Sequence, residues 1–343
     1  MELYQIKTDL PFIGYCETRI GGRQENQDYY GFSETPFGLL VTVCDGMGGG
    51  PAGKTASTIA VKEIIDGVVE AKKDNTPSNA LLQAINRANL AILNAVEDNP
   101  KLKGMGTTCT AVLINEHSAI VAHVGDSRVY QLRGHHKVFR TFDHSKVFEM
   151  VKLNIITEEQ ARLSEESNII TRALGLSKDV KVDITERPYE KGDRFMLCSD
   201  GIHGTMPESE LIKKVTTGNN LGLVVDRTAT EIDELGFNKG GRHDNLTLAI
   251  IETKTHSILK EKMSTQNKII LIGVGALLAL SCIFNITQCS RTRNSSKSIE
   301  ETGKNDTTIV NVNGDTLIIK ANAIRVIAKD GVECQFQIEQ QQK

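Results

Sequence analysis

Four aspartates of this 343-residue chain occupy positions where a charged side chain is unusual. Each lies at or beside the end of an apolar segment of the kind that forms a buried strand. The four are Asp45, Asp126, Asp200 and Asp244. A buried carboxylate is costly unless a positive charge balances it, and hard divalent cations take carboxylate oxygens as ligands. We therefore expect one site that holds divalent metal ions through oxygen.

The residue types favour Mg²⁺ or Mn²⁺ over Zn²⁺, because no cluster of histidines or cysteines accompanies the aspartates. Two such ions about 3.5–4 Å apart polarise a phosphoryl oxygen and make hydroxide from a bridging water. Arg23 can clamp a phosphate, since a guanidinium binds phosphate through two hydrogen bonds. Asp28 belongs to the same polar cluster, 23–28. Together these residues fit phosphoryl chemistry.

The segment 39–50 shows why one aspartate alone does not establish a metal site. Residues 39–44 are mostly apolar, which predicts a strand buried on both faces. Asp45 and a glycine cluster follow. A strand that ends in a tight Asp-Gly turn is one interpretation. A backbone carbonyl that approaches a ligand through the glycines is the other, and this segment leaves both open.

Composition excludes several classes of protein. The chain has 40 basic and 43 acidic residues and a net charge of −3, so we expect no nucleic-acid partner. Its seven cysteines are scattered without Cys-x-x-Cys spacing, which argues against a disulfide framework and a zinc site. Cys44 and Cys198 lie in apolar segments and are expected to pack in the core. No signal peptide is expected at the start, so the first domain should stay in the cytoplasm.

The expected strands and helices come in blocks rather than in strict alternation, which favours antiparallel sheets with helices packed outside. Helical periodicity covers 54–71, 78–97, 207–216 and 221–235, with a short helix near 157–164. We expect Ser78 to cap the second of these helices. Capping boxes are expected at Thr157 with Gln160 and at Thr205 with Glu208.

The order of motifs resembles that of the metal-dependent serine/threonine protein phosphatases of the protein phosphatase 2C (PPM) family, in its bacterial style. Eight motifs cover about residues 10–252. They are Arg23 with Asn26-Gln27-Asp28, the segment 43–49, Gly106-Thr107-Thr108, the segment 124–128, Asp143-His144-Ser145, the segment 171–175, Ser199-Asp200-Gly201 and Asp244-Asn245. Each motif is weak alone, but the ordered set is specific.

The resemblance implies an α+β fold, an α-β-β-α sandwich of two antiparallel sheets flanked by helices. It implies hydrolysis of phosphoserine and phosphothreonine in cytoplasmic proteins, with two Mn²⁺ or Mg²⁺ ions and a possible third. A metal-bridging hydroxide would attack phosphorus in line. A cognate serine/threonine kinase would be the functional partner. Arg23 and Asp45 would be the catalytic residues, with Arg23 on the substrate phosphate.

The implied metal ligands are Asp28, Asp45, Gly46, Asp126, Asp200 and Asp244. In the family pattern Asp45 would bridge both metals and the Gly46 carbonyl would bind one of them. Asp200 and Asp244 would hold the other. Asp126 would contribute to a third, weaker site that shares Asp200.

This chain departs from the family pattern at two positions. Many eukaryotic members have a histidine where this chain has Met47, and Met47 cannot protonate a leaving alkoxide. A metal-bound water or, as a weaker candidate, His144 would have to do so. Gln27 stands where many members have a glutamate. Its neighbour Asp28 would bind a metal directly or hold the waters of that metal. The segment 143–172 corresponds to the family's mobile flap.

The C-terminal quarter has a different pattern. Residues 269–284 carry no charge, which predicts a transmembrane helix near the lower length limit, with a buried core helix as the alternative. The expected parts are a catalytic domain at 1–255, a juxtamembrane linker at 256–267, the helix at 268–286 and an extracytoplasmic tail at 287–343 with a β-hairpin or meander. We therefore expect a single-pass protein of the inner membrane, with its catalytic domain in the cytoplasm.

Two rival interpretations remain at this stage. A pseudophosphatase would dock phosphoproteins without turnover, although the intact aspartate set argues against it. Alternatively, the membrane segment and tail would make the protein a sensor whose tail controls the phosphatase.

Overall fold

A computed structural model describes residues 2–48 and 52–259, together with the backbone of four strands near the C-terminus. The chain divides into two compact units, residues 1–260 and 261–343. The predicted transmembrane segment, 268–286, lies outside the described residues. Within the described part, no helix combines the length and the apolar character needed to cross a membrane.

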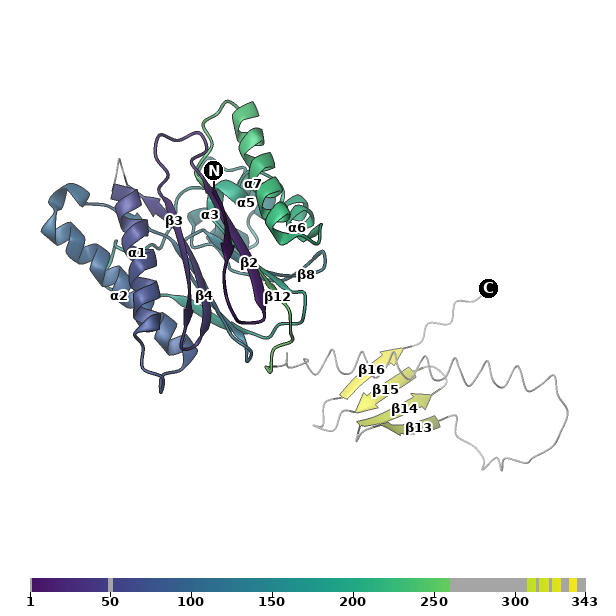
Figure 1. Cartoon of the computed structure of the whole chain (residues 1–343). Helices are drawn as coiled ribbons and strands as arrows, with labels where there is room; N and C mark the ends of the chain where they lie inside the picture. The colour runs from purple at the N-terminus through teal and green to yellow at the C-terminus, as the bar shows by residue number, and fades with distance from the viewer. Residues whose placement is uncertain are drawn as a thin grey trace, which may run out of the picture. The chain divides into compact units, whose positions relative to one another are not determined.

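The first unit is built on two antiparallel sheets (Figure 1). In the first sheet the strand order is β1-β2-β12-β11-β8-β9. These strands are β1 (Glu2–Ile6), β2 (Phe12–Arg19), β8 (Arg128–Arg133), β9 (His136–Arg140), β11 (Arg194–Cys198) and β12 (Leu246–Thr253). In the second sheet the order is β10-β7-β6-β4-β3, and β5 pairs with β4. These strands are β3 (Asp28–Thr35), β4 (Gly38–Met47), β5 (Gly106–Thr107), β6 (Cys109–Ile114), β7 (Ala119–Val124) and β10 (Asp183–Arg187).

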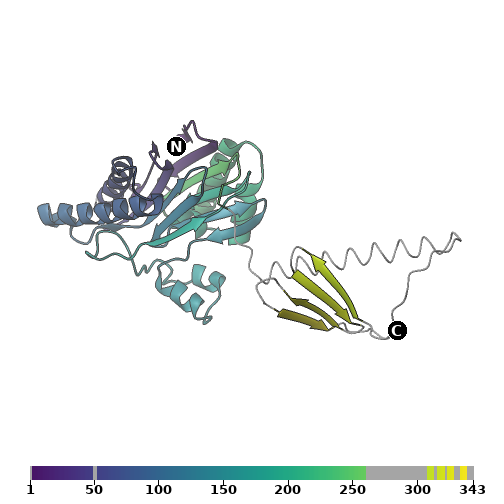
Figure 2. The same cartoon turned by 90° about the horizontal axis from the view of Figure 1, so that it is seen from below.

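Helices cover the outer faces of both sheets (Figures 1 and 2). The helices are α1 (Ala52–Val69), α2 (Pro77–Asp98), α3 (Lys146–Lys152), α4 (Glu158–Arg162), α5 (Asp200–His203), α6 (Glu208–Thr216) and α7 (Leu221–Asn238), with a 3₁₀ turn at Pro100–Leu102. Helices α1 and α2 share a core with the β4 sheet, and α5 to α7 share one with the β12 sheet. The expected α+β arrangement of two antiparallel sheets with helices outside is confirmed.

Strand β4 shows how the layers are held together. Leu39, Val41 and Val43 pack into the core between the sheets, whereas Leu40 and Cys44 pack against α1 and α2. All five are fully buried. The strand is therefore buried on both faces, as its apolar run predicted. Asp45 then follows at the point where this apolar alternation ends.

One expected helix start is confirmed and another is wrong. Thr157 and Gln160 make both hydrogen bonds of a capping box at the start of α4. The predicted box at Thr205 does not form, because α6 begins only after Pro207 and has no side-chain cap. A residue that precedes proline, here Met206, is pushed out of the helical region, so a helix cannot start as early as the Thr205 box requires.

The second helix, in contrast, starts earlier than predicted. Helix α2 begins at Pro77, and Thr76 is its N-cap. The Thr76 side chain accepts a hydrogen bond from the backbone N–H of Asn79 at 3.2 Å. Proline is favoured in the first helical position because its missing N–H would have no partner there. Ser78 therefore lies inside the first turn and is not the cap.

The second unit contains a sheet of four strands in sequential order, and each pairs antiparallel with the next. The strands are β13 (Thr307–Val312), β14 (Asp315–Lys320), β15 (Ala323–Ile327) and β16 (Glu333–Gln337). Three short connections suffice for such a meander, because antiparallel neighbours can be joined by tight turns. This sheet lies in the part of the chain where the sequence predicted a hairpin or meander.

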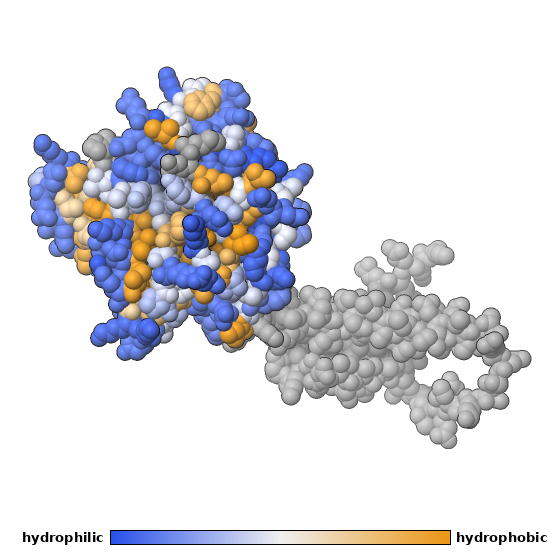
Figure 3. Space-filling model, in the orientation of Figure 1, coloured by the Kyte–Doolittle hydropathy of each residue, from blue (hydrophilic) through white to orange (hydrophobic). Residues whose placement is uncertain are grey.

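The surface of the first unit is chemically mixed. Charged and polar side chains cover much of the face seen in Figure 3, with apolar side chains between them. Scattered apolar side chains of this kind are normal on protein surfaces. In the whole chain neither sign of charge dominates, since its 40 basic and 43 acidic residues give a net charge of −3.

The cap of α2 can be tested by a matched pair of substitutions. Thr76→Ala should lower the free energy of unfolding by about 1 kcal/mol, because it removes the hydrogen-bond acceptor at the helix start. Ser78→Ala should leave it unchanged or raise it slightly, because alanine has the higher helix propensity. Urea unfolding of both variants measures the difference. A larger loss for Ser78→Ala would contradict the assignment of the cap.

Candidate active site

The predicted aspartates come from both sheets and meet at one edge of the sandwich. Asp45 lies near the end of β4, and Asp28 opens β3 directly opposite it across the strand pair. Asp200 begins α5 immediately after β11, and Asp244 lies two residues before β12. Asp126 lies in the turn between β7 and β8. The structure thus brings together five carboxylates that are far apart in the sequence.

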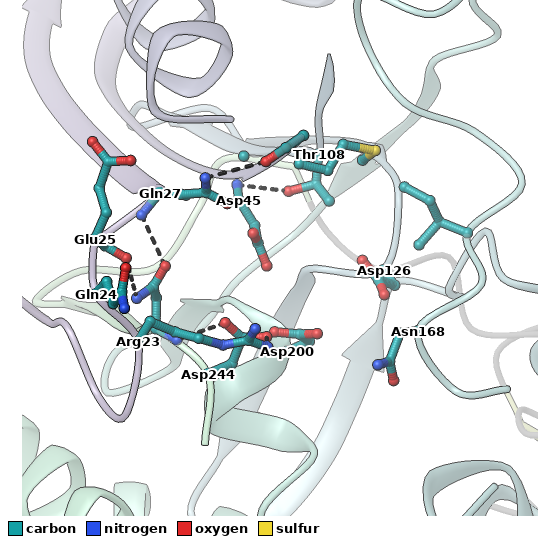
Figure 4. Close-up of a pocket in the computed structure, with 15 residues that line it drawn as sticks. Arg23, Gln24, Glu25, Gln27, Asp45, Thr108, Asp126, Asn168, Asp200 and Asp244 are labelled. Carbon is teal, nitrogen blue, oxygen red and sulfur yellow. Dashed lines mark hydrogen bonds and ion pairs between the residues drawn. The ribbon is translucent and has the colours of Figure 1, made fainter. Parts of the chain in front are cut away.

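These side chains surround a cavity of about 530 Å³ (Figure 4). Its lining comprises Arg23, Gln24, Glu25, Gln27, Asp45, Gly46, Met47, Gly48, Thr108, Asp126, Asn168, Ile170, Asp200, Asp244 and Asn245. Asp45, Asp126 and Asp200 face one another across it in Figure 4. Asp28 is buried beside Asp45, with only 1% of its surface exposed, and does not line this cavity.

The electrostatics of the site are those of crowded negative charge. Burial, reinforced by the other aspartates, raises the pKa of Asp45 well above its usual range. Burial also raises the pKa of Asp126 well above its ordinary value, and repulsion by Asp200 adds to the shift. The pKa of Asp200 rises to about 7 through burial and the nearby Asp244 and Asp28. Burial raises the pKa of Asp28 to about 6. Such a cluster needs a counter-charge if it is to ionise at neutral pH.

The donor set fits divalent cations. The buried oxygens Asp28 Oδ1 and Asp200 Oδ1 have no hydrogen-bond partner, whereas most buried polar atoms in proteins are paired. Arg23 is the one basic side chain among the residues that line the cavity, and it reaches only Asp244. Hard oxygen ligands of this kind suit Mg²⁺ or Mn²⁺. The residues present therefore fit the metals that the sequence predicted.

Arg23 lies at the mouth of the cavity, beside Asp244. Its Nη2 donates to Asp244 Oδ2 at 2.6 Å. About half of the Arg23 side chain and more than a third of that of Asp244 are exposed to solvent. Exposed ion pairs are weak, so this contact holds the guanidinium near the cavity without fixing it there.

Gly46 allows two backbone segments to approach closely. A Cβ atom added to Gly46 would lie 2.1 Å from the carbonyl oxygen of Gly53, in the first turn of α1, and 2.7 Å from that of Gln27. No side chain fits in that space. The N–H of Gly46 donates to the Gln27 carbonyl at 3.2 Å. The glycine after Asp45 is thus required by packing as well as by any role its carbonyl has.

Three polar residues that the sequence analysis left without a role position the aspartates. Ser199 donates its hydroxyl to Asp28 Oδ2 at 2.7 Å. The Thr108 hydroxyl accepts the N–H of Asp45 at 2.9 Å. Asn245 accepts the N–H of Gln27 and donates to two carbonyls of the 20–25 loop. All three belong to motifs of the sequence analysis, but nothing in the sequence indicated their partners, since each contact joins distant segments.

The segment 143–172 forms one wall of the site. Helices α3 and α4 have a small core of their own, which includes Phe148. Asn168 and Ile170 line the cavity from the flap side. Met47 also lines it, but His144 does not. Instead, the His144 ring bonds to neighbours at the base of the flap, so the structure places this weaker candidate for the acid away from the cavity.

Comparison with known proteins covers the first unit of the chain. The sequence model of the protein phosphatase 2C family matches residues 17–262. The serine/threonine phosphatase stp of Listeria monocytogenes is 34% identical over 251 residues, which are 72% of this chain and 94% of that protein.

Solved structures agree with these sequence matches. The serine/threonine phosphatase PstP/Ppp of Mycobacterium tuberculosis superposes with a TM-score of 0.61 at 29% identity, over 71% of this chain and 99% of that one. A catalytic domain of PstP in complex with two manganese ions gives a TM-score of 0.58 at 28% identity, over 70% of this chain and 97% of that one. This chain therefore belongs to the protein phosphatase 2C family, and it is a serine/threonine protein phosphatase.

Proposed function

We propose that this protein removes phosphate from phosphoserine and phosphothreonine of proteins in a reaction that requires Mn²⁺ or Mg²⁺. One observation carries the proposal above the others. Four aspartates line a single cavity, and the only basic side chain that lines it with them is Arg23. This arrangement leaves room and charge for divalent cations and, through them, for a phosphate group.

The proposed ligands divide into sets. Asp45 would bridge two metals, with the Gly46 carbonyl on one and Asp200 and Asp244 on the other. Asp28, the cross-strand partner of Asp45, would bind a metal directly or hold its waters. The unpartnered buried oxygens of Asp28 and Asp200 support a cation in this site. The two manganese ions of the PstP structure support the number two. Bound divalent ions would polarise the phosphoryl oxygen and supply a hydroxide nucleophile that attacks in line.

Asp126 is proposed as part of a third site that shares Asp200. Its side chain lines the same cavity as Asp200, from the β7–β8 turn, and repulsion by Asp200 adds to the rise of its pKa above the ordinary value. His203 Nε2 lies 3.0 Å from the carbonyl oxygen of Asp126 and, as the donor, holds the turn in place. The ligands of a third, more weakly bound metal ion would therefore already be in position.

The side chains of this protein have two further tasks in the proposed reaction. Arg23 would turn from Asp244 to the phosphate and bind two of its oxygens. The leaving oxygen needs a proton, and no histidine lies among the residues that line the cavity. Met47 occupies the position of the histidine in many eukaryotic members and cannot supply one. We therefore assign the leaving-group proton to water rather than to a side chain.

The proposed substrates are proteins phosphorylated on serine or threonine, and a serine/threonine kinase would supply them. The name of the Listeria relative, a serine/threonine phosphatase, supports this substrate class. We further propose that the chain is tethered to the inner membrane through 268–286, with residues 1–255 in the cytoplasm and 287–343 outside. The uncharged run 269–284 supports the tether. The tail would either anchor the enzyme or act as a sensor.

Removal of a ligand carboxylate should abolish turnover. Asp45→Asn and Asp200→Asn should each lower kcat/KM for a phosphothreonine peptide with Mn²⁺ by more than about a hundredfold, since loss of an outer-shell partner of a metal ligand already costs 10–100-fold. Asp74→Asn, an exposed control, should keep the activity of the unaltered protein. Equal activity in all of these proteins would contradict the proposed metal site.

Metal binding should also be visible without activity, as a change in Tm that depends on pH. The folded pKa values of Asp28 and Asp200, about 6 and about 7, exceed the ordinary 3.8. Protonation therefore stabilises the metal-free fold at low pH, and this contribution is lost as the pH rises through 6 to 7. Mn²⁺ must displace those protons, so it should raise Tm by about 5 °C or more at pH 7.5 and clearly less at pH 5.5.

Differential scanning calorimetry of the dialysed protein, with and without Mn²⁺, measures this effect. Asp200→Asn should reduce the shift at pH 7.5, whereas Asp74→Asn should not. A shift that is equal at the two pH values, or larger at pH 5.5, would contradict the pKa-based account.

The membrane tether can be tested by fractionation. The full chain should stay in the membrane pellet after carbonate extraction, whereas a chain that ends at residue 259 should appear in the supernatant with its phosphatase activity retained. A reporter fused to the C-terminus should be active only outside the cytoplasm. Extraction of the full chain by carbonate would rule out the span, and a reporter active in the cytoplasm would reverse the orientation.

A further inference from the structure

The flap leaves the catalytic unit and returns to it at one point. Lys146 N donates to the Ile169 carbonyl at 2.9 Å, and Thr171 N donates to the His144 carbonyl at 2.7 Å. These bonds lie side by side at the two ends of the segment 143–172. The contacts that hold this base therefore help to set the wall that Asn168 and Ile170 form along the cavity, together with contacts at α4 such as Arg140 with Glu158 at 2.6 Å.

The imidazole of His144 fastens the base to the turn that carries Asp126. His144 is 1% exposed. Its backbone N–H donates to the Gly125 carbonyl at 2.8 Å, and the Gly125 N–H donates back to His144 Nδ1 at 3.1 Å. Gly125 has φ of +102°, and an added Cβ would lie 2.6 Å from the side chain of Thr108. Thr108 in turn accepts the N–H of Asp45.

The bond from Gly125 also decides which nitrogen of His144 carries the proton. Burial lowers the pKa of His144, so the ring is neutral at pH 7. A neutral ring whose Nδ1 accepts must carry its hydrogen on Nε2. Nε2 lies 3.1 Å from Asp183 Oδ2, which is the acceptor that this hydrogen requires.

Asp183 has a second partner from the far end of the flap. Arg172 Nη1 donates to Asp183 Oδ1 at 3.2 Å. Arg172 Nη1 also lies 3.0 Å from His144 Nε2. Because both nitrogens carry hydrogen, they do not bond to each other, and each donates to the Asp183 carboxylate instead. Asp183 is on β10, opposite His123 of β7. One carboxylate thus binds a residue from each end of the flap.

The same residues could be taken for a metal site, because donor atoms of His123, His144 and Asp183 lie within 4.8 Å of one another. The buried His123 Nε2 has no hydrogen-bond partner, which would favour a ligand. However, a metal on His144 Nε2 requires a hydrogen on Nδ1, and Nδ1 already accepts the Gly125 N–H. The geometry therefore favours hydrogen bonds over a metal.

We propose that Asp183 is a positioning residue, which joins His144 and Arg172 so that the flap wall stays in register with the cavity. This proposal rests on the proposed phosphatase function. Asn168 and Ile170 of the flap line the cavity, and a phosphoprotein, which extends beyond the cavity, would make more contacts with the flap than a small aryl phosphate would. Loss of the Asp183 contacts should therefore weaken the binding of phosphopeptides more than the hydrolysis of a small ester.

The test compares Asp183→Asn with Asp179→Asn, an exposed aspartate in the preceding loop. We expect Asp183→Asn to raise KM for a phosphothreonine peptide about threefold to tenfold, as for one ordinary hydrogen bond, because solvent screens the charge of the half-exposed Asp183. Its kcat for p-nitrophenyl phosphate should change less than twofold. Trypsin cleavage within the flap should also become faster. Arg172→Met, a second variant that leaves the buried His144 intact, should show the same split between KM and kcat. Asp179→Asn should match the unaltered protein in every assay.

Several results would overturn the proposal. Equal losses for the two substrates in both variants would indicate a general structural role, and no loss in either would remove the role altogether. One equivalent of zinc that survives dialysis in the unaltered protein but not in Asp183→Asn would indicate a metal site instead. An unaltered protein that hydrolyses neither substrate would refute the proposed function itself, and so separates the two failures.

Discussion

The repulsion among buried carboxylates is the constraint on which the rest of this structure depends. Asp28 and Asp45 are cross-strand partners, and Asp126, Asp200 and Asp244 close around the same cavity. Their crowding raises the pKa values of Asp45 and Asp200. Such an arrangement stores unfavourable electrostatic free energy in the metal-free fold, and divalent cations would release it. Metal affinity and fold stability would therefore be linked through the same atoms.

A rigid frame is needed to hold like charges this close together. β4 supplies it by burying its side chains on both faces as far as Asp45. Gly46 lets the first turn of α1 pack directly on the strand, where any side chain would collide. Hydroxyls of Ser199 and Thr108 then bind one carboxylate and one backbone N–H. Each of these contacts removes freedom that the aspartates would otherwise use to separate.

The flap is held more locally than the sandwich. Its own core is small. Polar contacts attach it at its base, including the buried ion pair of Arg128 with Asp143 at 2.6 Å, and at α4, where Arg140 Nη1 lies 2.6 Å from Glu158 Oε2. A wall with few apolar contacts to the main core can move at lower cost than a strand of the sheet.

The local pattern of the sequence was enough to predict that β4 is buried on both faces and that the sheets are antiparallel. It also predicted that the aspartates gather in one oxygen-rich site. These predictions succeeded because apolar runs and motif order are properties of the chain itself. The local pattern also predicted the capping box at Thr157. It failed at Ser78 and Thr205, where a proline shifted the helix start. Tertiary structure alone decided that Arg23 rests on Asp244, that Ser199 binds Asp28 and that Asp183 joins His144 to Arg172. These residues belong to different strands, loops and the flap, and only the folded arrangement of these parts brings their atoms within hydrogen-bonding distance.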